Sequence, residues 1–501
     1  MSAQDAAYPI GTRNTLPPRS VVHALPMRTG VLGSYGPTLP ARTEQLGERT
    51  VWTSDEEPYG ITAVERRLGE SLVCCFGDRI GGTSSAPDVP ELKPWLDWSR
   101  AAMLRGCGAI CGPRNLTLWT DAAAACPLFY AFDPAGQPVF STRAKLLVDL
   151  LPQPREFVFA DGTRPLPGEG RSVFAGIRAV PPGTVLELER DKPRWRLRGV
   201  HRYFRLPVPQ IRSMETAQVL AREALESSVR TAASDVDEVS VTLSGGVDSS
   251  SVAAIAHHLG KRVLTYTVGS PFGNEFRQAG EVAPLIGSEH HEFMMTLEDL
   301  EALLPNLILA LETWDPVTLQ IAAPAAFAYR KSAQMRLAGK AIFLTGYGAD
   351  LIFAGVADTT LPECQLESFI RKQVRLTVPT NEFSPSYAGN HGITVRYPFW
   401  SPMMLTTALS MRARLKVCGG AVKYVLRSAA EAWLPSHVAW REKVGIHEGT
   451  SMHRLFSECL GESTWEGQNR VLRKLASRVL LEEPAVLPGI VAEEMSQCAS
   501  F

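Results

Sequence analysis

The sequence has almost no net charge and no long apolar run. Its 51 Lys and Arg residues are balanced by 52 Asp and Glu, so no global basic field is available for nucleic acid. The first residues, Met1 to Asp5, lack the charged and apolar regions of a leader, and no apolar run is long enough to cross a bilayer. We therefore expect a cytoplasmic protein with a small-molecule substrate and neither a nucleic-acid nor a membrane partner; a homo-oligomer remains open.

A disulfide framework and a cysteine zinc site are also disfavoured. The nine cysteines are an odd number scattered through 501 residues, unlike a small disulfide-stapled fold. Cys107 and Cys111 lack the second ligand pair that a zinc site needs, and the adjacent His290 and His291 would face opposite ways on a strand. We interpret these groups as structural.

The length of the chain and its hydrophobic pattern predict an α/β protein with two domains, residues 1–207 and 208–501. The first part contains short strand-like runs broken by Gly and Pro, which are Leu116–Trp119, Leu128–Ala131, Val139–Thr142 and Thr184–Leu188. The second part alternates helix-like and strand-like segments, with strands at Val239–Leu243, Val263–Val268 and Ala341–Thr345. That order predicts a parallel sheet with ligands at the carboxyl ends of its strands.

The stretch Leu243-Ser244-Gly245-Gly246-Val247-Asp248-Ser249 is the strongest candidate for a binding loop. It joins a predicted strand to a predicted helix that ends at Gly260. Glycines let the backbone approach a ligand, and the N–H groups of a first helical turn favour an anion. An ordinary glycine-rich turn is the alternative. The loop lacks the Lys of the Gly-x4-Gly-Lys-Ser/Thr motif, and Asp248 would repel phosphates unless a cation such as Mg²⁺ lay between them.

A second loop, Thr345-Gly346-Tyr347-Gly348-Ala349-Asp350, also follows an apolar strand. Its Asp350 would reach the same edge of the sheet as Asp248, and the two carboxylates could share one Mg²⁺ bound to triphosphate oxygens. Val268, at the end of another strand, could face adenine. By itself each segment could equally be a turn or a plain core strand.

The segment Ser244-Gly-Gly-Val-Asp-Ser-Ser250 resembles the signature of the PP-loop ATP pyrophosphatases, which split ATP into AMP and pyrophosphate. Further segments make residues 210 to 460 similar to the β-lactam synthetases, and most closely to the carbapenam-forming members. These segments are the Tyr347 loop, Asn381–Phe383, Gly392–Trp400, Lys423–Arg427 and Trp440–Gly449.

The resemblance implies a reaction and a set of site residues. In these enzymes a substrate carboxylate attacks the α-phosphorus of ATP, and an amine of the same molecule then closes the ring as AMP leaves. By position, Tyr347 would take the amine proton, Glu382 would assist it, and Lys443 would stabilise the oxyanion. Lys423 would hold pyrophosphate. The residues implied to bind ATP are Leu243, Ser244, Gly245, Gly246, Asp248, Ser249, Val268, Thr345, Gly346 and Lys423, and those implied to bind Mg²⁺ are Asp248 and Asp350.

The first 207 residues are more loosely similar to the glutaminase domain of asparagine synthetases, which implies an Ntn-hydrolase-like αββα fold. Those relatives use an N-terminal cysteine as the nucleophile, exposed after Met removal, whereas this chain has Ser2. A hydroxyl is a poorer nucleophile than a thiol at neutral pH. We therefore expect an inactive glutaminase-like domain and no ammonia supply, so that the amine comes with an amino acid substrate.

The residues near the expected amine site indicate which substrate fits. In clavam-forming members an Asp shortly before the catalytic Glu receives a guanidinium group, and the aligned position here is Gln373, beside Arg371, Lys372 and Arg375. This favours a carboxymethylproline-like substrate and a carbapenam product. Two alternatives remain: an asparagine synthetase-like amide ligase or macrolactam cyclase using another amine, and a nucleotide-binding scaffold without turnover.

Overall fold

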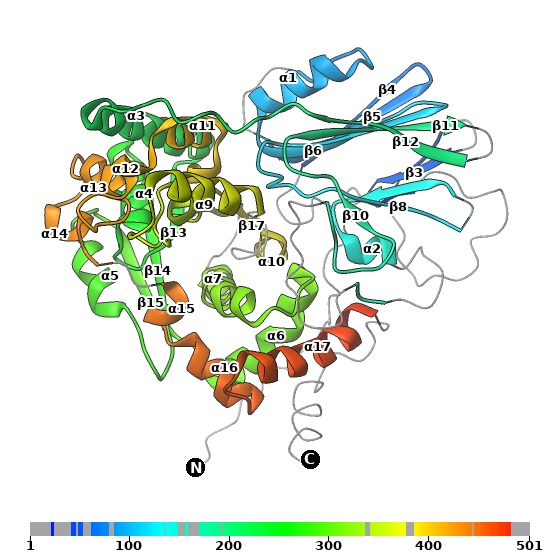
Figure 1. The fold of residues 1–501 in the computed structure, drawn as a ribbon. Coiled ribbons are helices and arrows are strands. Elements are labelled where there is room, and N and C mark those ends of the chain that lie inside the picture. The colour runs from blue at the N-terminus through cyan, green and yellow to red at the C-terminus, as the bar shows by residue number, and fades with distance from the viewer. Residues whose placement is uncertain are drawn as a thin grey trace, which may run out of the picture.

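The computed structural model of the protein shows two regions that differ in sheet type (Figure 1). Antiparallel sheets, drawn in blue and cyan, lie on one side, and a parallel sheet with many helices lies on the other. The structure describes residues 22–24, 42–46, 49–53, 62–79, 85–134, 136–148, 156–158, 170–191, 194–335, 341–376, 385–442 and 445–481.

The antiparallel region contains a six-stranded sheet of order β12-β11-β7-β6-β5-β4, a four-stranded sheet of order β1-β9-β8-β10, and the pair β2-β3. The strand bounds are β1 Val22–Ala24, β2 Arg42–Leu46, β3 Arg49–Thr53, β4 Thr62–Leu68, β5 Ser71–Arg79, β6 Met103–Cys111, β7 Asn115–Thr120, β8 Phe129–Phe132, β9 Pro138–Ser141, β10 Arg178–Ala179, β11 Thr184–Asp191 and β12 Arg194–Arg202. The four strand-like runs expected from the sequence coincide with β7, β8, β9 and β11 to within three residues at their ends.

Each face of the six-stranded sheet buries its own set of side chains, because successive residues of a strand point to opposite faces. On one face Leu72, Cys74 and Phe76 pack with Tyr130 and Phe140 of the four-stranded sheet. On the other face Val73 and Cys75 pack with Trp95 and Trp98 of helix α1 (Leu92–Ala102). Helix α2 (Ala144–Val148) contacts β8 and β9. The layers therefore run helix, sheet, sheet, helix.

The parallel sheet has the order β15-β14-β13-β16-β17, and all of its neighbouring strands run parallel. Its strands are β13 Glu238–Thr242, β14 Arg262–Gly269, β15 Glu289–Met294, β16 Ala341–Leu344 and β17 Ile393–Arg396. This confirms the α/β class and the parallel sheet. In β13 the residues alternate between apolar and polar types, yet Ser240 is as buried as Val239, because helices cover both faces of a parallel sheet.

Helices connect these strands and cover the sheet. Helix α4 packs on β13 and β14, α7 packs on β14, and α3 contacts α4 and α13. Helix α6 begins with a capping box in which Thr296 and Asp299 satisfy each other's backbone N–H groups. The remaining bounds are α3 Met214–Ala232, α4 Val247–His258, α5 Phe276–Val282, α6 Leu297–Leu311, α7 Pro316–Met335, α8 Ala349–Ile352, α9 Glu363–Leu376, α10 Pro385–Gly389, the 3₁₀ turn Pro398–Trp400, α11 Pro402–Ser410, α12 Ala413–Lys416, α13 Tyr424–Ala430, α14 Ser436–Ala439, α15 Ile446–Gly449, α16 Met452–Leu460 and α17 Trp465–Leu481.

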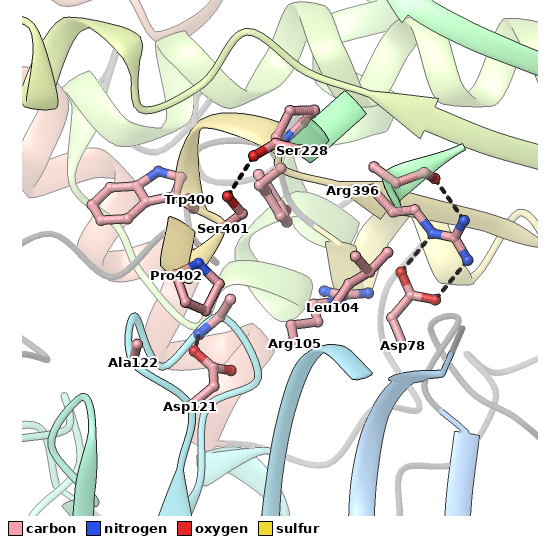
Figure 2. A pocket seen from close by; sticks show the side chains of 14 residues that line it. Asp78, Leu104, Arg105, Asp121, Ala122, Ser228, Arg396, Trp400, Ser401 and Pro402 are labelled. Atoms are coloured by element: carbon pink, nitrogen blue, oxygen red, sulfur yellow. Dashed lines mark hydrogen bonds and ion pairs between the residues drawn. The ribbon is translucent and has the colours of Figure 1, made fainter. Parts of the chain in front are cut away.

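Two buried ionic contacts join the regions. Arg396, at the end of β17, donates to both carboxylate oxygens of Asp78 at 2.8 and 3.0 Å (Figure 2) and also binds Asp235 and the Ala232 carbonyl. Burial alone would lower the pKa of Arg396, but the two carboxylates raise it above its ordinary value. Elsewhere Arg143 donates to Glu312 at 2.9 Å. Both arginines are held by specific hydrogen bonds, so they fix how the regions meet.

The structure also shows the hydropathy of the helices and the burial of the cysteines in the described residues. In the part of the chain that the structure describes, no helix combines the length and the apolar character needed to cross a membrane. Of the described cysteines, Cys364 and Cys418 are exposed and the others are buried as thiols. No group of three or more His, Cys, Asp and Glu side chains in the described residues forms a metal cluster. His290 instead contacts the Thr265 hydroxyl at 2.9 Å, which fits its structural interpretation.

Candidate active site

The loop after β13 has a backbone shape that only glycine accommodates. Gly245 has φ +73°, and a Cβ atom there would lie 2.6 Å from the carbonyl oxygen of Gln278. The Gly245 carbonyl accepts a hydrogen bond of 2.9 Å from the guanidinium of Arg441. Leu243 is fixed by the hydrogen bond that its N–H donates to the Tyr266 carbonyl, at 2.8 Å. The loop is therefore held rigidly between β13 and α4.

The start of helix α4 presents polar groups to the loop. Gly246 is the N-cap and supplies no side-chain cap, so its helix has N–H groups for a ligand. The Ser249 hydroxyl accepts a hydrogen bond of 3.3 Å from the Ser244 N–H, and the buried Ser250 hydroxyl has no hydrogen-bond partner among the described residues. A buried, unsatisfied hydroxyl at a helix start suits an anion such as phosphate.

The second predicted loop lies directly against the first. A Cβ atom at Gly346 would lie 2.7 Å from the Ser249 nitrogen and 2.9 Å from the Asp248 Cβ, so only glycine allows the two loops to approach this closely. Thr345 is 1% exposed, and its hydroxyl accepts a hydrogen bond of 3.0 Å from the Tyr347 N–H. The predicted residues of both loops are thus brought together at the carboxyl ends of β13 and β16.

Asp248 and Asp350 meet at one cation, the ammonium group of Lys423. The Lys423 Nζ atom contacts Asp248 Oδ2 and lies 2.7 Å from Asp350 Oδ1, and the lysine side chain is fully buried. We call these three residues the Asp–Lys–Asp cluster. In the sequence analysis Lys423 is implied to bind pyrophosphate; its ammonium in this structure contacts the carboxylates, and the phosphate role stays a prediction.

The backbone around this cluster is strained at two residues that are not glycine. Lys423 has φ +57° and Ala354 has φ +62°, a conformation that costs about 1 kcal/mol or more for an L-residue. Gly355 follows Ala354, and a Cβ atom there would lie 2.3 Å from the Lys423 Cε and 2.2 Å from Asp350 Oδ1. Backbone strain of this kind concentrates at functional sites. The strained backbone at Lys423 and Ala354 accompanies the placement of the Lys423 ammonium between Asp248 and Asp350.

The Asp–Lys–Asp cluster has the chemistry of a cation site. Asp248 Oδ1 is buried and has no hydrogen-bond partner among the described residues, although Oδ2 of the same carboxylate contacts Lys423. Carboxylate oxygens are the preferred ligands of Mg²⁺, which usually takes one or two of them together with phosphate oxygens. Asp248 and Asp350 therefore fit the expected metal.

Tyr347 lies in an aromatic pocket beside the cluster. It is 9% exposed, and its ring centroid is 6.3 Å from those of both Tyr397 and Trp400. Gly348, with φ +98°, allows the loop to pass Trp400, because a Cβ atom there would lie 2.4 Å from the indole nitrogen. An excluded-water setting of this kind is what a phenol needs to act in proton transfer.

Two predicted catalytic residues, Glu382 and Lys443, lie outside the described residues. The described neighbours of Lys443 are nevertheless anchored. Arg427 donates from Nη1 to the carbonyls of Ala439 at 2.8 Å and Arg441 at 2.7 Å. Burial lowers the pKa of Arg427, and the charges of Asp248 and Asp350 oppose that shift. Sequence reasoning gave no role to Arg427 or Arg441, although both lie in segments that carry the family resemblance, Lys423–Arg427 and Trp440–Gly449.

The remaining predicted positions lie on β14 and α9. Val268 is buried at the end of β14, paired with Phe293 of β15, and β14 runs beside the first loop, since the Thr267 hydroxyl donates to the Leu243 carbonyl. A contact of Val268 with adenine stays a prediction. Gln373 is half-buried on α9, and the neighbouring Arg371 donates to the backbone carbonyls of Leu206 and Pro207. Arg371 therefore also holds the connection between the two regions, a role that the sequence analysis did not assign.

Comparison with known protein families identifies the parallel-sheet region. The family model described as asparagine synthase matches residues 220–383 and 367–485. The matched ranges contain both loops, Lys423 and the whole of the described candidate site. They begin after the antiparallel sheets end.

Two curated relatives align over much of the chain. Carboxyethyl-arginine beta-lactam-synthase of Streptomyces clavuligerus is 31% identical over 372 residues, which are 72% of this chain and 69% of that protein. Asparagine synthetase B of Escherichia coli is 26% identical over 66% of this chain and 57% of its own length. Among solved structures, NMN synthetase from Francisella tularensis matches 56% of this chain with a TM-score of 0.24 and 14% identity, too low a likeness to add to the observed topology.

Proposed function

Because the chain belongs to the asparagine synthase family, we propose that it is an ATP-dependent C–N ligase that closes a β-lactam within one substrate molecule. The observation that carries the proposal is the Asp–Lys–Asp cluster, formed where two glycine loops meet at the edge of the parallel sheet. The relative named for β-lactam synthesis supports the ring-closing chemistry.

The first half-reaction is carboxylate activation. A substrate carboxylate oxygen attacks the α-phosphorus of ATP, and the bond from this phosphorus to the oxygen shared with the β-phosphate breaks. Pyrophosphate departs, and the substrate becomes an acyl-adenylate. The N–H groups at the start of α4, with Ser244, Ser249 and Ser250, would bind phosphate oxygens. A magnesium ion held by Asp248 and Asp350 would neutralise triphosphate charge. Lys423 would keep the two carboxylates from repelling each other and would hold departing pyrophosphate.

The second half-reaction is ring closure. The substrate's own amine attacks the acyl carbon, AMP leaves, and one proton must be removed from the amine. Tyr347 would take this proton, because its aromatic pocket with Tyr397 and Trp400 keeps water away. Glu382 would assist the transfer, and Lys443 would stabilise the tetrahedral oxyanion. The departure of AMP from the activated acyl group would supply the free energy for closing the strained ring.

The antiparallel region would be a glutaminase-like domain without glutaminase activity. Its helix–sheet–sheet–helix layers support this proposal, and the serine at position 2 favours loss of activity. The substrate would then carry its own amine. Gln373 in place of an acid favours a carboxymethylproline-like diacid, which would give a carbapenam, over a guanidino substrate.

Incubation with ATP, Mg²⁺ and a panel of β-amino diacids tests the proposal. We expect AMP and pyrophosphate in equal amounts and a product lighter than the substrate by one water, measured by mass spectrometry. Release of ADP, or incorporation of a second amine into the product, would contradict it. The Lys443→Ala variant should still bind ATP but lose ring formation, whereas Lys93→Ala, at an exposed lysine on α1 of the antiparallel region, should retain it.

A further inference from the structure

A cavity separate from the two glycine loops lies where the connecting segment passes helix α9. Its volume is about 290 Å³, and four arginines line it: Arg202 at the end of β12, Arg205 in the connecting segment, and Arg371 and Arg375 on α9. We call it the arginine cleft. None of the described residues that line it is acidic.

Among the described residues, few acidic groups balance the charge of the arginine cleft. The nearby carboxylate of Glu367 is bound to Arg412 at 3.1 Å. Arg371 is held in place by the Leu206 and Pro207 carbonyls, which carry no full charge. Burial lowers the pKa of Arg371 and the positive charge of Arg375 lowers it further, while the charge of Glu367 only partly opposes the shift. Like charges kept together at one cavity favour an anionic ligand.

The rest of the cleft wall is largely apolar. Phe204, Leu206, Val374, Trp400 and Leu405 line it alongside the arginines. An inorganic anion would leave these side chains without a partner, whereas an organic acid would cover them and bring its charges to the guanidinium groups. We propose that the arginine cleft binds a small organic diacid.

Trp400 connects this cleft to the candidate active site, since its ring lines the cleft and lies 6.3 Å from the ring of Tyr347. The diacid could be the substrate of the proposed reaction or a separate effector. A substrate and an effector would bind the arginines in the same way. Loss of the binding site would raise the KM if the diacid is the substrate, and would abolish regulation if it is an effector. Binding itself does not depend on the proposed lactam chemistry.

Calorimetric titration of the full-length protein with glutarate, without ATP, tests the proposal. Sodium acetate and sodium chloride at equal ionic strength serve as reference anions. We expect the double variant Arg205→Gln/Arg375→Gln to weaken glutarate binding at least tenfold, because it removes two exposed guanidinium groups and leaves the anchoring Arg371 intact. The matched control Arg222→Gln, an exposed arginine on α3 outside the cleft, should bind like the wild type.

Equal glutarate affinity in the double variant and the wild type would overturn the proposal, and so would inorganic phosphate binding as tightly as glutarate. Kinetics then separates the two sources. A higher KM for the amino diacid in the double variant supports the substrate, and an unchanged KM with lost sensitivity to glutarate supports an effector. If the enzyme shows no turnover, only the proposed function is contradicted, because the calorimetric titration measures glutarate binding and does not require catalysis.

Discussion

Two clusters each hold one cation between two aspartates, and they differ in how many hydrogen bonds the cation makes. In one, Arg396 binds both oxygens of Asp78, both oxygens of Asp235 and a backbone carbonyl. In the other, Lys423 contacts one oxygen of Asp248 and one oxygen of Asp350. Asp248 retains a buried oxygen without a hydrogen bond from the described residues.

The difference follows from the two cations. A guanidinium is planar and offers five donors in a fixed fork, so Arg396 can bind both oxygens of each carboxylate. An ammonium is a compact charge that touches one oxygen of each partner, and Asp248 Oδ1 has no hydrogen-bond partner among the described residues. The arginine cluster therefore joins two parts of the fold. In the lysine cluster, Asp248 keeps a carboxylate oxygen that could bind a cation.

The largest expected effect concerns the Asp–Lys–Asp cluster. Asp248→Asn should reduce ATP-dependent pyrophosphate release about a thousandfold, because it removes a charge from the proposed cation site, while thermal stability changes little. Pyrophosphate release and thermal melting measure the two effects. The matched variant Asp235→Asn in the arginine cluster should keep activity within about threefold. Equal activity losses in both would remove the distinction between the clusters.

The arginine cluster should show its effect in stability. Arg396→Met leaves Asp78 and Asp235 without their shared cation and should lower the free energy of unfolding by about 3 kcal/mol or more. Urea denaturation of the full-length protein measures this loss. Arg396→Lys should lose less, since an ammonium still neutralises the pair. An unfolding curve for Arg396→Met identical to the wild type would show that the cluster is not structural.

The tyrosines beside the two clusters provide a finer comparison. Tyr347→Phe should slow lactam formation about a hundredfold and leave pyrophosphate release unchanged, because the proposed proton transfer follows adenylation. Tyr397→Phe, at a ring centroid distance of 6.3 Å, should affect neither step. Product mass spectrometry and pyrophosphate release measure the two steps separately. Loss of both steps in Tyr347→Phe would assign the residue to nucleotide binding instead.

The smallest expected effect concerns Lys416, a buried cation that forms no ion pair with the described residues. Burial lowers the pKa of Lys416 to about 7 from 10.5, with Glu367 opposing the shift and Arg371 adding to it. The folded state thus holds its proton less tightly than the unfolded state, and Lys416 costs stability increasingly as the pH falls from about 10.5 to 7. Lys416→Met should stabilise the protein by about 1 kcal/mol or more at pH 7.

That stabilisation should shrink as the pH is raised towards 10.5, because the lysine is neutral in both states only above that pH. Urea denaturation at pH 7 and pH 9.5 gives the comparison. A benefit of Lys416→Met that is the same at both values would show that the lysine's charge is not its cause.

The sequence alone was enough to predict the helices and strands whose hydrophobic pattern, glycines and residue composition all indicate the same structure. The glycine loop after Val239–Leu243, the following helix, and the parallel order were readable because strand alternation, glycine and helix composition change within a few residues. The pairing of Asp248 with Asp350 at one edge also followed, because parallel strands bring their carboxyl ends together. The resemblance supplied the family, which the comparisons confirm.

Only the tertiary structure showed which side chains from distant parts of the sequence form ion pairs and line a common cavity. Lys423 is 175 residues from Asp248, and Arg396 is 318 residues from Asp78, and no local pattern specifies such partners. The arginine cleft likewise combines a connecting segment with a later helix. Sequence periodicity reports which face of an element is buried, whereas charge pairing depends on which elements pack together, and packing is a property of the whole chain.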